Sequence, residues 1–172
     1  TVCPGAPVTL TVSATGTSLT YQWRQDGGDI SGANDSSYSF AAVAGSYDVV
    51  VTGFCGLPLA SDPAVIAVKS GPSAIDDIYN VAMNIPLNIG APGVLSNDTD
   101  PEGDALTAAL VSTTMHGALT LNANGSFSYA PGLNYSGPDG FVYSAVDICG
   151  APATASVTIN VAAGNLPPIA IN

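Results

Sequence analysis

Short runs in which apolar and polar residues alternate fill this chain, and Gly and Pro residues separate them. Val8, Leu10 and Val12 form one such run, and residues 47–51 form another. A period of two over four to eight residues gives a strand one face in a core and one in solvent. No stretch repeats apolar residues at helical spacing over three turns. The chain is therefore predicted to be all-β.

A break in this pattern divides the chain in two. Residues 69–73, Lys-Ser-Gly-Pro-Ser, cannot continue a central strand, and the alternation resumes at Ile75. We predict two antiparallel Greek-key β-sandwiches in tandem, residues 1–69 and 70–162. Residues 163–172 are predicted to be a linker and the start of a following repeat.

The charge balance limits the partners of this chain. Thirteen acidic residues face only two basic ones, Arg24 and Lys69, for a net charge of −11. Nucleic acids and anionic membrane surfaces require the opposite sign. No apolar run approaches the roughly 20 residues that span a bilayer, so direct membrane insertion is not expected. Cations, neutral sugars and other proteins remain as partners.

Two segments of the first predicted domain carry a family resemblance. Residues 19–27, LTYQWRQDG, and 44–50, AGSYDVV, place Trp23 on one strand and Tyr47 two residues before Val49 on another. They resemble the bacterial immunoglobulin-like family. The resemblance implies a sandwich in which Trp23 and Tyr47 pack in the core, rather than forming a sugar-stacking platform.

Three cysteines are unevenly placed along the chain. The positions of the usual inter-sheet disulfide of this family hold Val12 and Val49, whereas Cys3 and Cys55 flank the domain. Because surface proteins occupy an oxidising space, we predict a Cys3–Cys55 disulfide, with two free buried thiols as the alternative. Cys149 is the odd cysteine, either a free thiol or bonded to a neighbouring module or chain.

The second predicted domain has its strands at about 77–87, 105–112, 117–122, 126–130, 140–147 and 153–161. Leu119 and Leu121 are predicted to face Phe127 and Tyr129 across a hairpin. Its turn contains Asn124-Gly125, a dipeptide that favours the type I′ conformation.

An acidic loop, Asn-Asp-Thr-Asp-Pro-Glu-Gly-Asp, occupies residues 97–104. Carboxylates this close repel each other, and a cation relieves the repulsion. Calcium takes six to eight oxygen ligands, whereas zinc or copper prefers His or Cys, which this loop lacks. The loop is not an EF-hand, because Ala109 stands where the bidentate Glu is needed and no helices are predicted. Further ligands are sought in Asp76, Asp77, Asp139 and Asp147. A solvated acidic turn without metal is the alternative.

A second resemblance covers residues 73–161. Residues 74–79, 93–106, 116–121, 125–131 and 134–143 are similar to the bacterial cadherin-like repeat, and residues 165–172 resemble the opening of a further copy. The resemblance implies tandem modules of large adhesins, including those of gliding and biofilm-forming bacteria, with calcium near module junctions. The ligands that it implies are Asp76, Asp77, Asn97, Asp98, Asp100 and Asp104, with Glu102 as a weaker candidate. Asp147, one of the further carboxylates named above, completes the predicted metal ligands.

Enzymatic activity is not expected. A Ser or Cys nucleophile needs a base, and the only histidine, His116, lies in a predicted turn where a structural role is favoured. The carboxylates stand in a loop suited to a metal rather than across an open cleft.

The sequence thus predicts a non-catalytic repeat segment of a large bacterial cell-surface adhesin. It would be extracellular, act as a calcium-stiffened spacer and support adhesion or gliding-type motility. Its partners would be adjacent repeats of the same chain, with surface glycans or proteins bound through other domains. The alternative is a carbohydrate- or protein-binding module with a site in the loops at one sandwich end. That alternative requires exposed aromatics such as Tyr38, Phe54 or Tyr135 beside polar groups.

Overall fold

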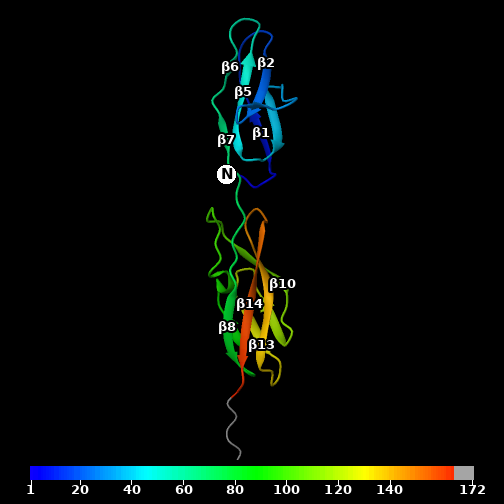
Figure 1. The fold of residues 1–172 in the computed structure, drawn as a ribbon, viewed down its shortest axis with the longest axis vertical. Coiled ribbons are helices and arrows are strands. Elements are labelled where there is room, and N and C mark those ends of the chain that lie inside the picture. Colours follow the sequence, from blue (N-terminus) through cyan, green and yellow to red (C-terminus); the bar gives the residue numbers. More distant parts are fainter. Residues whose placement is uncertain (165–172) are drawn as a thin grey trace, which may run out of the picture. The chain divides into compact units, whose positions relative to one another are not determined.

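The computed structural model describes residues 1–164, which form strands and one 3-10 helix (Figure 1). The chain consists of two compact units, the first domain, Thr1–Lys69, and the second domain, Ser70–Asn172. The predicted start of a further repeat at residues 165–172 lies outside the described residues. Among the described residues, no helix has the length and apolar character needed to cross a membrane.

The first domain is built from two small sheets. One pairs β1 with β4, and the other has the order β3-β2-β5-β6, with β7 also paired to β5. The strands are β1 Pro7–Thr11, β2 Thr20–Gln25, β3 Gly28–Asp29, β4 Ser37–Ala41, β5 Gly45–Thr52, β6 Leu59–Ala60 and β7 Ala64–Ile66.

The core of this domain lies where β2 and β5 meet. Trp23 is directly opposite Val49, and their exposed fractions are 3% and 0%. The Tyr47 hydroxyl donates a hydrogen bond of 3.2 Å to the carbonyl oxygen of Val43, four residues upstream. A core Trp and a Tyr bonded back to its own chain are features of the immunoglobulin sandwich. The predicted inward positions of both rings are confirmed.

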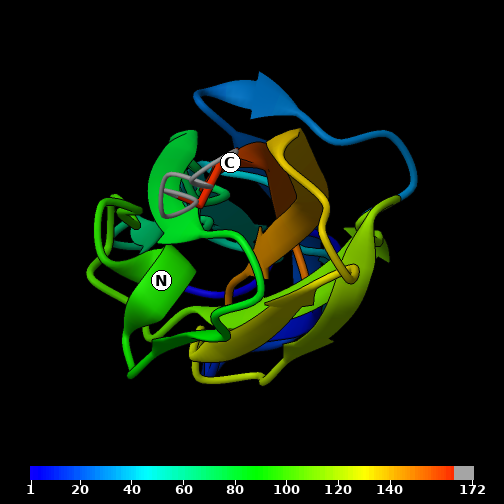
Figure 2. The same ribbon diagram turned by 90° about the horizontal axis from the view of Figure 1, so that it is seen from below.

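The second domain is a sandwich of a four-stranded sheet, order β10-β13-β14-β8, and a three-stranded sheet, order β11-β12-β9 (Figure 2). Its elements are β8 Asp77–Ala82, β9 Leu87–Ile89, the 3-10 helix Gly93–Leu95, β10 Thr107–Ser112, β11 Gly117–Leu121, β12 Phe127–Pro131, β13 Gly137–Val146 and β14 Pro152–Ala162.

Alternation along β14 explains this core. Val157 and Ile159 are buried, whereas Thr158 between them is exposed. Aromatic rings from both sheets complete the core, because Phe127 of β12 meets Phe141 of β13 edge to face at 5.4 Å. One pairing departs from the antiparallel expectation, since β8 runs parallel to β14. These are the first and last strands of the domain, so no hairpin connection forces them to be antiparallel.

The predicted hairpin has the expected register and a different turn. Leu119 pairs with Tyr129, and Leu121 pairs with Phe127. The turn type is wrong, because Gly125 has a φ of 82° whereas Asn124 is not in the positive-φ region that a type I′ turn requires. The loop has one residue more than that turn, since the main chain of Asn122 bonds to both Gly125 and Ser126. A side chain at Gly125 would lie 1.9 Å from the Pro92 carbonyl oxygen.

The predicted strand at 77–87 is too long. The strand β8 ends at Ala82, Asn84 adopts a φ of 63°, and the chain then crosses to the other sheet, where Leu87–Ile89 pairs with β12. Asn84 and the following Pro86 explain the break, because neither conformation continues a strand.

Candidate functional site

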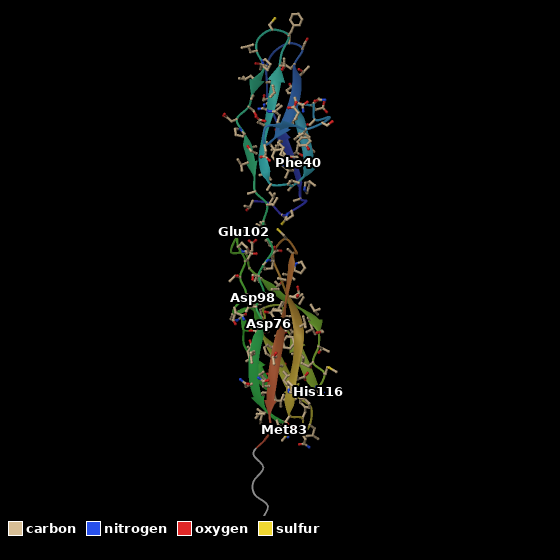
Figure 3. The ribbon with its side chains drawn as sticks, in the orientation of Figure 1. Phe40, Asp76, Met83, Asp98, Glu102 and His116 are labelled. Atoms are coloured by element: carbon tan, nitrogen blue, oxygen red, sulfur yellow. The ribbon has the colours of Figure 1, made fainter. Side chains whose placement is uncertain are left out.

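The predicted metal ligands gather at one end of the second domain. Asp77 begins β8, the acidic loop follows the 3-10 helix, and Asp147 follows β13. Val146 pairs with Thr107, so the register places Asp147 at the end of the sheet where the acidic loop joins β10. Asp76 and Asp98 lie at this end of the domain, whereas His116 lies toward the other (Figure 3).

Hydrogen bonds fasten the acidic loop to the segment that leads into β8. The main-chain N–H of Ile75 donates to Asp98 Oδ1 at 2.8 Å. Ser73 and Thr99 exchange two main-chain hydrogen bonds, of 2.8 and 3.0 Å. Glu102, an exposed residue, accepts from the Ser70 N–H at 3.0 Å. The loop and residues 70–77 therefore form one connected structure.

Asp100 shapes the loop with one oxygen and leaves the other without a partner. Its Oδ1 accepts from the main-chain N–H groups of Glu102 and Asp104, both at 3.0 Å. Its Oδ2 is buried and has no hydrogen-bond partner. Asp98, Asp100 and Asp104 line one hollow of about 340 Å³, together with Pro92, Leu95, Leu106 and Asn124.

Asp77 is the most perturbed carboxylate of this end. It is 8% exposed, and its Oδ2 has no hydrogen-bond partner. Burial, followed by the charge of the nearby Asp98, raises the pKa of Asp77 to about 6. The Oδ1 of Asn97 is also buried without a partner. Tyr143 and Asn97 favour the ionised form of Asp77, but they offset only part of the free-energy cost of burial and of the neighbouring charges.

Tyr143 lies beneath these acids and fixes Asp98. Its hydroxyl is 2.8 Å from the Val94 carbonyl oxygen and 2.9 Å from Asp98 Oδ2. Burial, and then the hydrogen bond to Asp98, raise the pKa of Tyr143, so the phenol keeps its proton and remains a donor.

The two remaining predicted ligands serve the main chain with one oxygen each. Asp76 Oδ1 accepts from the Ser156 N–H at 2.7 Å, and Asp147 Oδ1 accepts from the Ala151 N–H at 2.8 Å. Asp147 thereby closes the turn between β13 and β14. Its Oδ2 is buried without a hydrogen-bond partner.

The donor set fits a hard cation in its chemistry. The orphaned atoms of Asp77, Asn97, Asp100 and Asp147 are all carboxylate or amide oxygens, which calcium prefers. In residues 1–164, however, no three His, Cys, Asp or Glu side chains form a group that could hold a metal ion. Any ion at this end would therefore need main-chain carbonyls, Asn97 or water among its ligands.

Asp139, which the sequence also offered as a ligand, belongs to a different arrangement. It accepts hydrogen bonds from the main-chain N–H groups of Met115, His116 and Gly140, each at 2.9 Å, and from the Tyr129 hydroxyl at 2.8 Å. Burial opposes its ionisation, but these bonds outweigh it and lower the pKa of Asp139. Sequence reasoning missed this role, because three of the four donors are main-chain groups.

His116 lies beside this buried carboxylate. Its ring stacks on Tyr135 with 4.2 Å between centroids, and its Nδ1 is 3.8 Å from Asp139 Oδ1. Among the contacts of residues 1–164, the His116 ring has no acidic or hydroxyl group other than Asp139 with which it could exchange a proton. The arrangement packs the turn that precedes β11.

The predicted Cys3–Cys55 disulfide is wrong. Cys55 is a free, exposed thiol, whereas Cys3 and Cys149 are each disulfide-bonded. Val2 bridges to Val68 beside the Gly45 end of β5, but Cys55 follows the Thr52 end of that strand. Eight extended residues span roughly 25 Å, whereas the Cα atoms of a disulfide are within about 7 Å.

Comparison with solved structures finds immunoglobulin-type and cadherin chains at low similarity. Sidekick-1 immunoglobulin domains 1–4 match at 16% identity and a TM-score of 0.43, covering 96% of this chain and 45% of that one. The human Desmocollin-1 ectodomain matches at 13% identity and a TM-score of 0.41, covering 89% and 35%. The fibronectin(III)-like modules of Clostridium thermocellum CbhA match at 16% identity and a TM-score of 0.36, covering 99% and 94%.

Comparison with curated proteins finds no match. The model of the bacterial cadherin-like domain matches residues 69–163, more than half of the chain. This range contains the acidic loop and all the strands β8 to β14 of the second domain. The chain therefore belongs to the bacterial cadherin-like domain family.

Proposed function

We propose that this chain is a non-catalytic repeat segment of a large bacterial cell-surface adhesin. It acts as a calcium-stiffened spacer and supports cell-surface adhesion or gliding-type motility. One observation carries the proposal: buried carboxylate and amide oxygens lack partners at the end of the domain where the acidic loop is fastened to the incoming chain.

Calcium would supply the positive charge that this end lacks. Asp77, Asn97, Asp98 and Asp100 are the residues that would hold it, with Asp104 and Asp76 close to them and Asp147 at the same end of the domain. Because residues 70–77 and the acidic loop already bond to each other, an ion shared between them would restrict the segment that leads into β8. Restriction of that segment is the physical basis of a stiff spacer.

The setting and partners belong to the same proposal. The disulfide-bonded Cys3 and Cys149 are typical of an oxidising, extracellular compartment. Adjacent repeats of the same chain are the direct partners, and surface glycans or proteins are bound by other domains. The non-catalytic role is supported by His116, whose ring is engaged with Tyr135.

Thermal unfolding of the whole chain with excess calcium and with a chelator tests the spacer. Trp23 fluorescence reports the first domain, which holds the only Trp. The near-ultraviolet signal of the tyrosines comes from both domains, so the second domain is read from the tyrosine transition that Trp23 fluorescence does not follow. At a calcium concentration of 100 Kd, the second domain gains about 2.7 kcal/mol, which corresponds to roughly 10 °C or more.

Asp98→Asn is expected to remove most of this calcium response. Asp62→Asn, an exposed residue of the first domain, is the matched control and keeps it. A second-domain midpoint that does not move with calcium contradicts the proposal and identifies the loop as a solvated turn.

A binding module is the second candidate function, with a protein or carbohydrate site in the loops at one sandwich end. One observation favours it. The Phe54 ring is 80% exposed beside a hollow in the first domain. Tyr38 and Tyr135, the other two aromatics considered, are half-buried in ring stacks.

A further inference from the structure

A hollow of about 540 Å³ opens between two loops at one end of the first domain. One loop, residues 13–19, follows β1, and the other, residues 53–58, follows β5. Both lie at the end of the domain that carries β6 (Figure 1). The volume is within the roughly 300–1,000 Å³ of small-ligand sites.

The two loops are held together at the base of this hollow. The Phe54 N–H donates to the Thr17 carbonyl oxygen at 3.1 Å. Val51 pairs with Leu59, which places the start of β6 on the same side. The main chain of Phe54 is thus anchored while its ring stands in solvent, so the ring serves no packing role in the described chain.

The position of the hollow corresponds to a known ligand-binding end of the fold. With Trp23 on β2 and the hydrogen-bonded Tyr47 on β5, the loops after β1 and β5 correspond to the B–C and F–G loops of an immunoglobulin sandwich. In variable domains, these loops belong to the end that binds antigen.

The chemistry of the lining is unusual for so acidic a chain. No Asp, Glu, Lys, Arg, His, Asn or Gln side chain lines the hollow. Val12, Leu19 and Val51 form its apolar part, and the rim carries Phe54 and Leu59, which are 80% and 75% exposed. Leu57, in the same loop as Phe54, is 92% exposed. Exposed apolar groups gathered in this way mark an interaction surface.

We propose that this hollow, the apical hollow, binds an uncharged segment of another protein that inserts bulky apolar side chains. The proposal rests on the second candidate function and names its partner. A charged partner would lose hydration at a lining without a countercharge. Of the polar side chains that could orient a sugar, the lining offers only the hydroxyls of Ser13, Thr15, Thr17 and Ser61, with no amide or charged group, and the Ser61 hydroxyl already bonds to the Asp62 carbonyl oxygen. The exposed Phe54 and Leu59 at the rim favour apolar side chains instead.

An NMR titration of the isotopically labelled whole chain tests the proposal. The probe is a capped, uncharged peptide of alternating leucine and phenylalanine, and cellotetraose is the sugar comparison. The peptide is expected to shift the amide signals of Thr15, Thr17 and Phe54, and cellotetraose is expected to leave them unchanged. Bound peptide should also slow maleimide labelling of the exposed Cys55 thiol, which lines the hollow.

The double variant Phe54→Ser, Leu59→Ser should weaken peptide binding by about tenfold or more, the factor for losing one buried apolar side chain. Both side chains are exposed, and Trp23 fluorescence checks that the fold is kept. Leu133→Ser, with an equally exposed leucine in the second domain, is the control and should bind as the parent does.

Three results would overturn the proposal: no shift with the peptide, equal binding by the double variant, or shifts with cellotetraose alone, which would assign the hollow to sugars. The calcium response of the second domain is measured separately. A negative peptide titration would therefore not affect the spacer proposal. Absence of a calcium response would likewise not affect the proposal that the apical hollow binds an apolar protein segment.

Discussion

Asp77 and Asp139 are both buried aspartates on the inner face of the second domain, and their surroundings are opposite. Asp139 is 9% exposed and receives four hydrogen bonds that lower its pKa. Asp77 is 8% exposed, has an orphaned oxygen and lies near Asp98, and its pKa is raised. The protein therefore supplies hydrogen-bond donors to both oxygens of Asp139, the first carboxylate. It leaves one oxygen of the second without a hydrogen-bond partner, which is the feature on which the proposed calcium site rests.

The largest expected effect comes from removing the completed carboxylate. Asp139→Ala leaves the N–H groups of Met115, His116 and Gly140 without their acceptor, and also the Tyr129 hydroxyl. Loss of a buried network of this kind costs about 3–5 kcal/mol. Chemical denaturation should show this loss equally with calcium and with chelator. Asp62→Ala is the exposed control, and an effect of Asp139→Ala below about 1 kcal/mol would contradict the comparison.

The incomplete carboxylate should respond in the opposite way. Asp77→Asn removes the repulsion with Asp98 and keeps the side-chain shape, so the chelated protein should be as stable as the parent or more stable. With calcium, the variant should lose most of the gain of about 2.7 kcal/mol expected at 100 Kd. Calorimetric unfolding with and without calcium measures both. A full calcium response in Asp77→Asn would show that Asp77 is not a ligand.

The smallest expected effect is on the pH dependence without calcium. The pKa of Asp77 is about 6 in the folded chain and 3.8 in the reference state. A raised folded pKa adds stability at low pH that is lost as the pH rises through 6, with an upper bound of about 3 kcal/mol. Acidification from pH 7.5 to 5 should therefore raise the midpoint of the chelated second domain by a few degrees.

At pH values below the ordinary pKa of a carboxyl group, Asp139 makes the second domain less stable on further acidification, which is opposite to the effect of Asp77. Its lowered pKa gives stability that is lost as the pH falls and Asp139 becomes protonated. The Asp77→Asn variant should lack the rise between pH 7.5 and 5 and keep the fall at lower pH. A parent midpoint that declines steadily from pH 7.5 would argue against a strained Asp77.

The fold was largely predictable because alternation decides which face of a strand is buried. The hairpin of Leu119 and Leu121 with Tyr129 and Phe127 has the register that this alternation requires. The short strands β4 and β9 were not predicted. Both pair with strands from other parts of the domain. The three residues of β9 are too few for a pattern to stand out, whereas the five residues of β4 alternate as those of β1 do, so a strand could have been predicted there.

The residue types at the candidate site could be predicted from the sequence, but the hydrogen-bond partners of each carboxylate could not. Asn97 and Asp98 of the acidic loop lie beside residues 75 and 76, as the hydrogen bonds from Ile75 to Asp98 and from Asn97 to the Asp76 carbonyl oxygen show. Which oxygen remains without a partner depends on main-chain donors far away in the sequence. Asp139, for example, accepts hydrogen bonds from N–H groups that lie 23 and 24 residues earlier in the sequence. Cysteine pairing failed for a related reason, because chain order does not show at which end of a strand a residue emerges.

The parallel pairing of β8 with β14 has a mechanical consequence. The six residues of β8 pair in register with Val157–Ala162 at the end of β14. The chain enters the domain at the start of β8 and leaves it after the end of β14, and the two strands run in the same direction. A pull between these points therefore loads the interstrand hydrogen bonds in shear, all together, instead of opening them one after another. Tension carried along the chain meets its greatest resistance at this ladder.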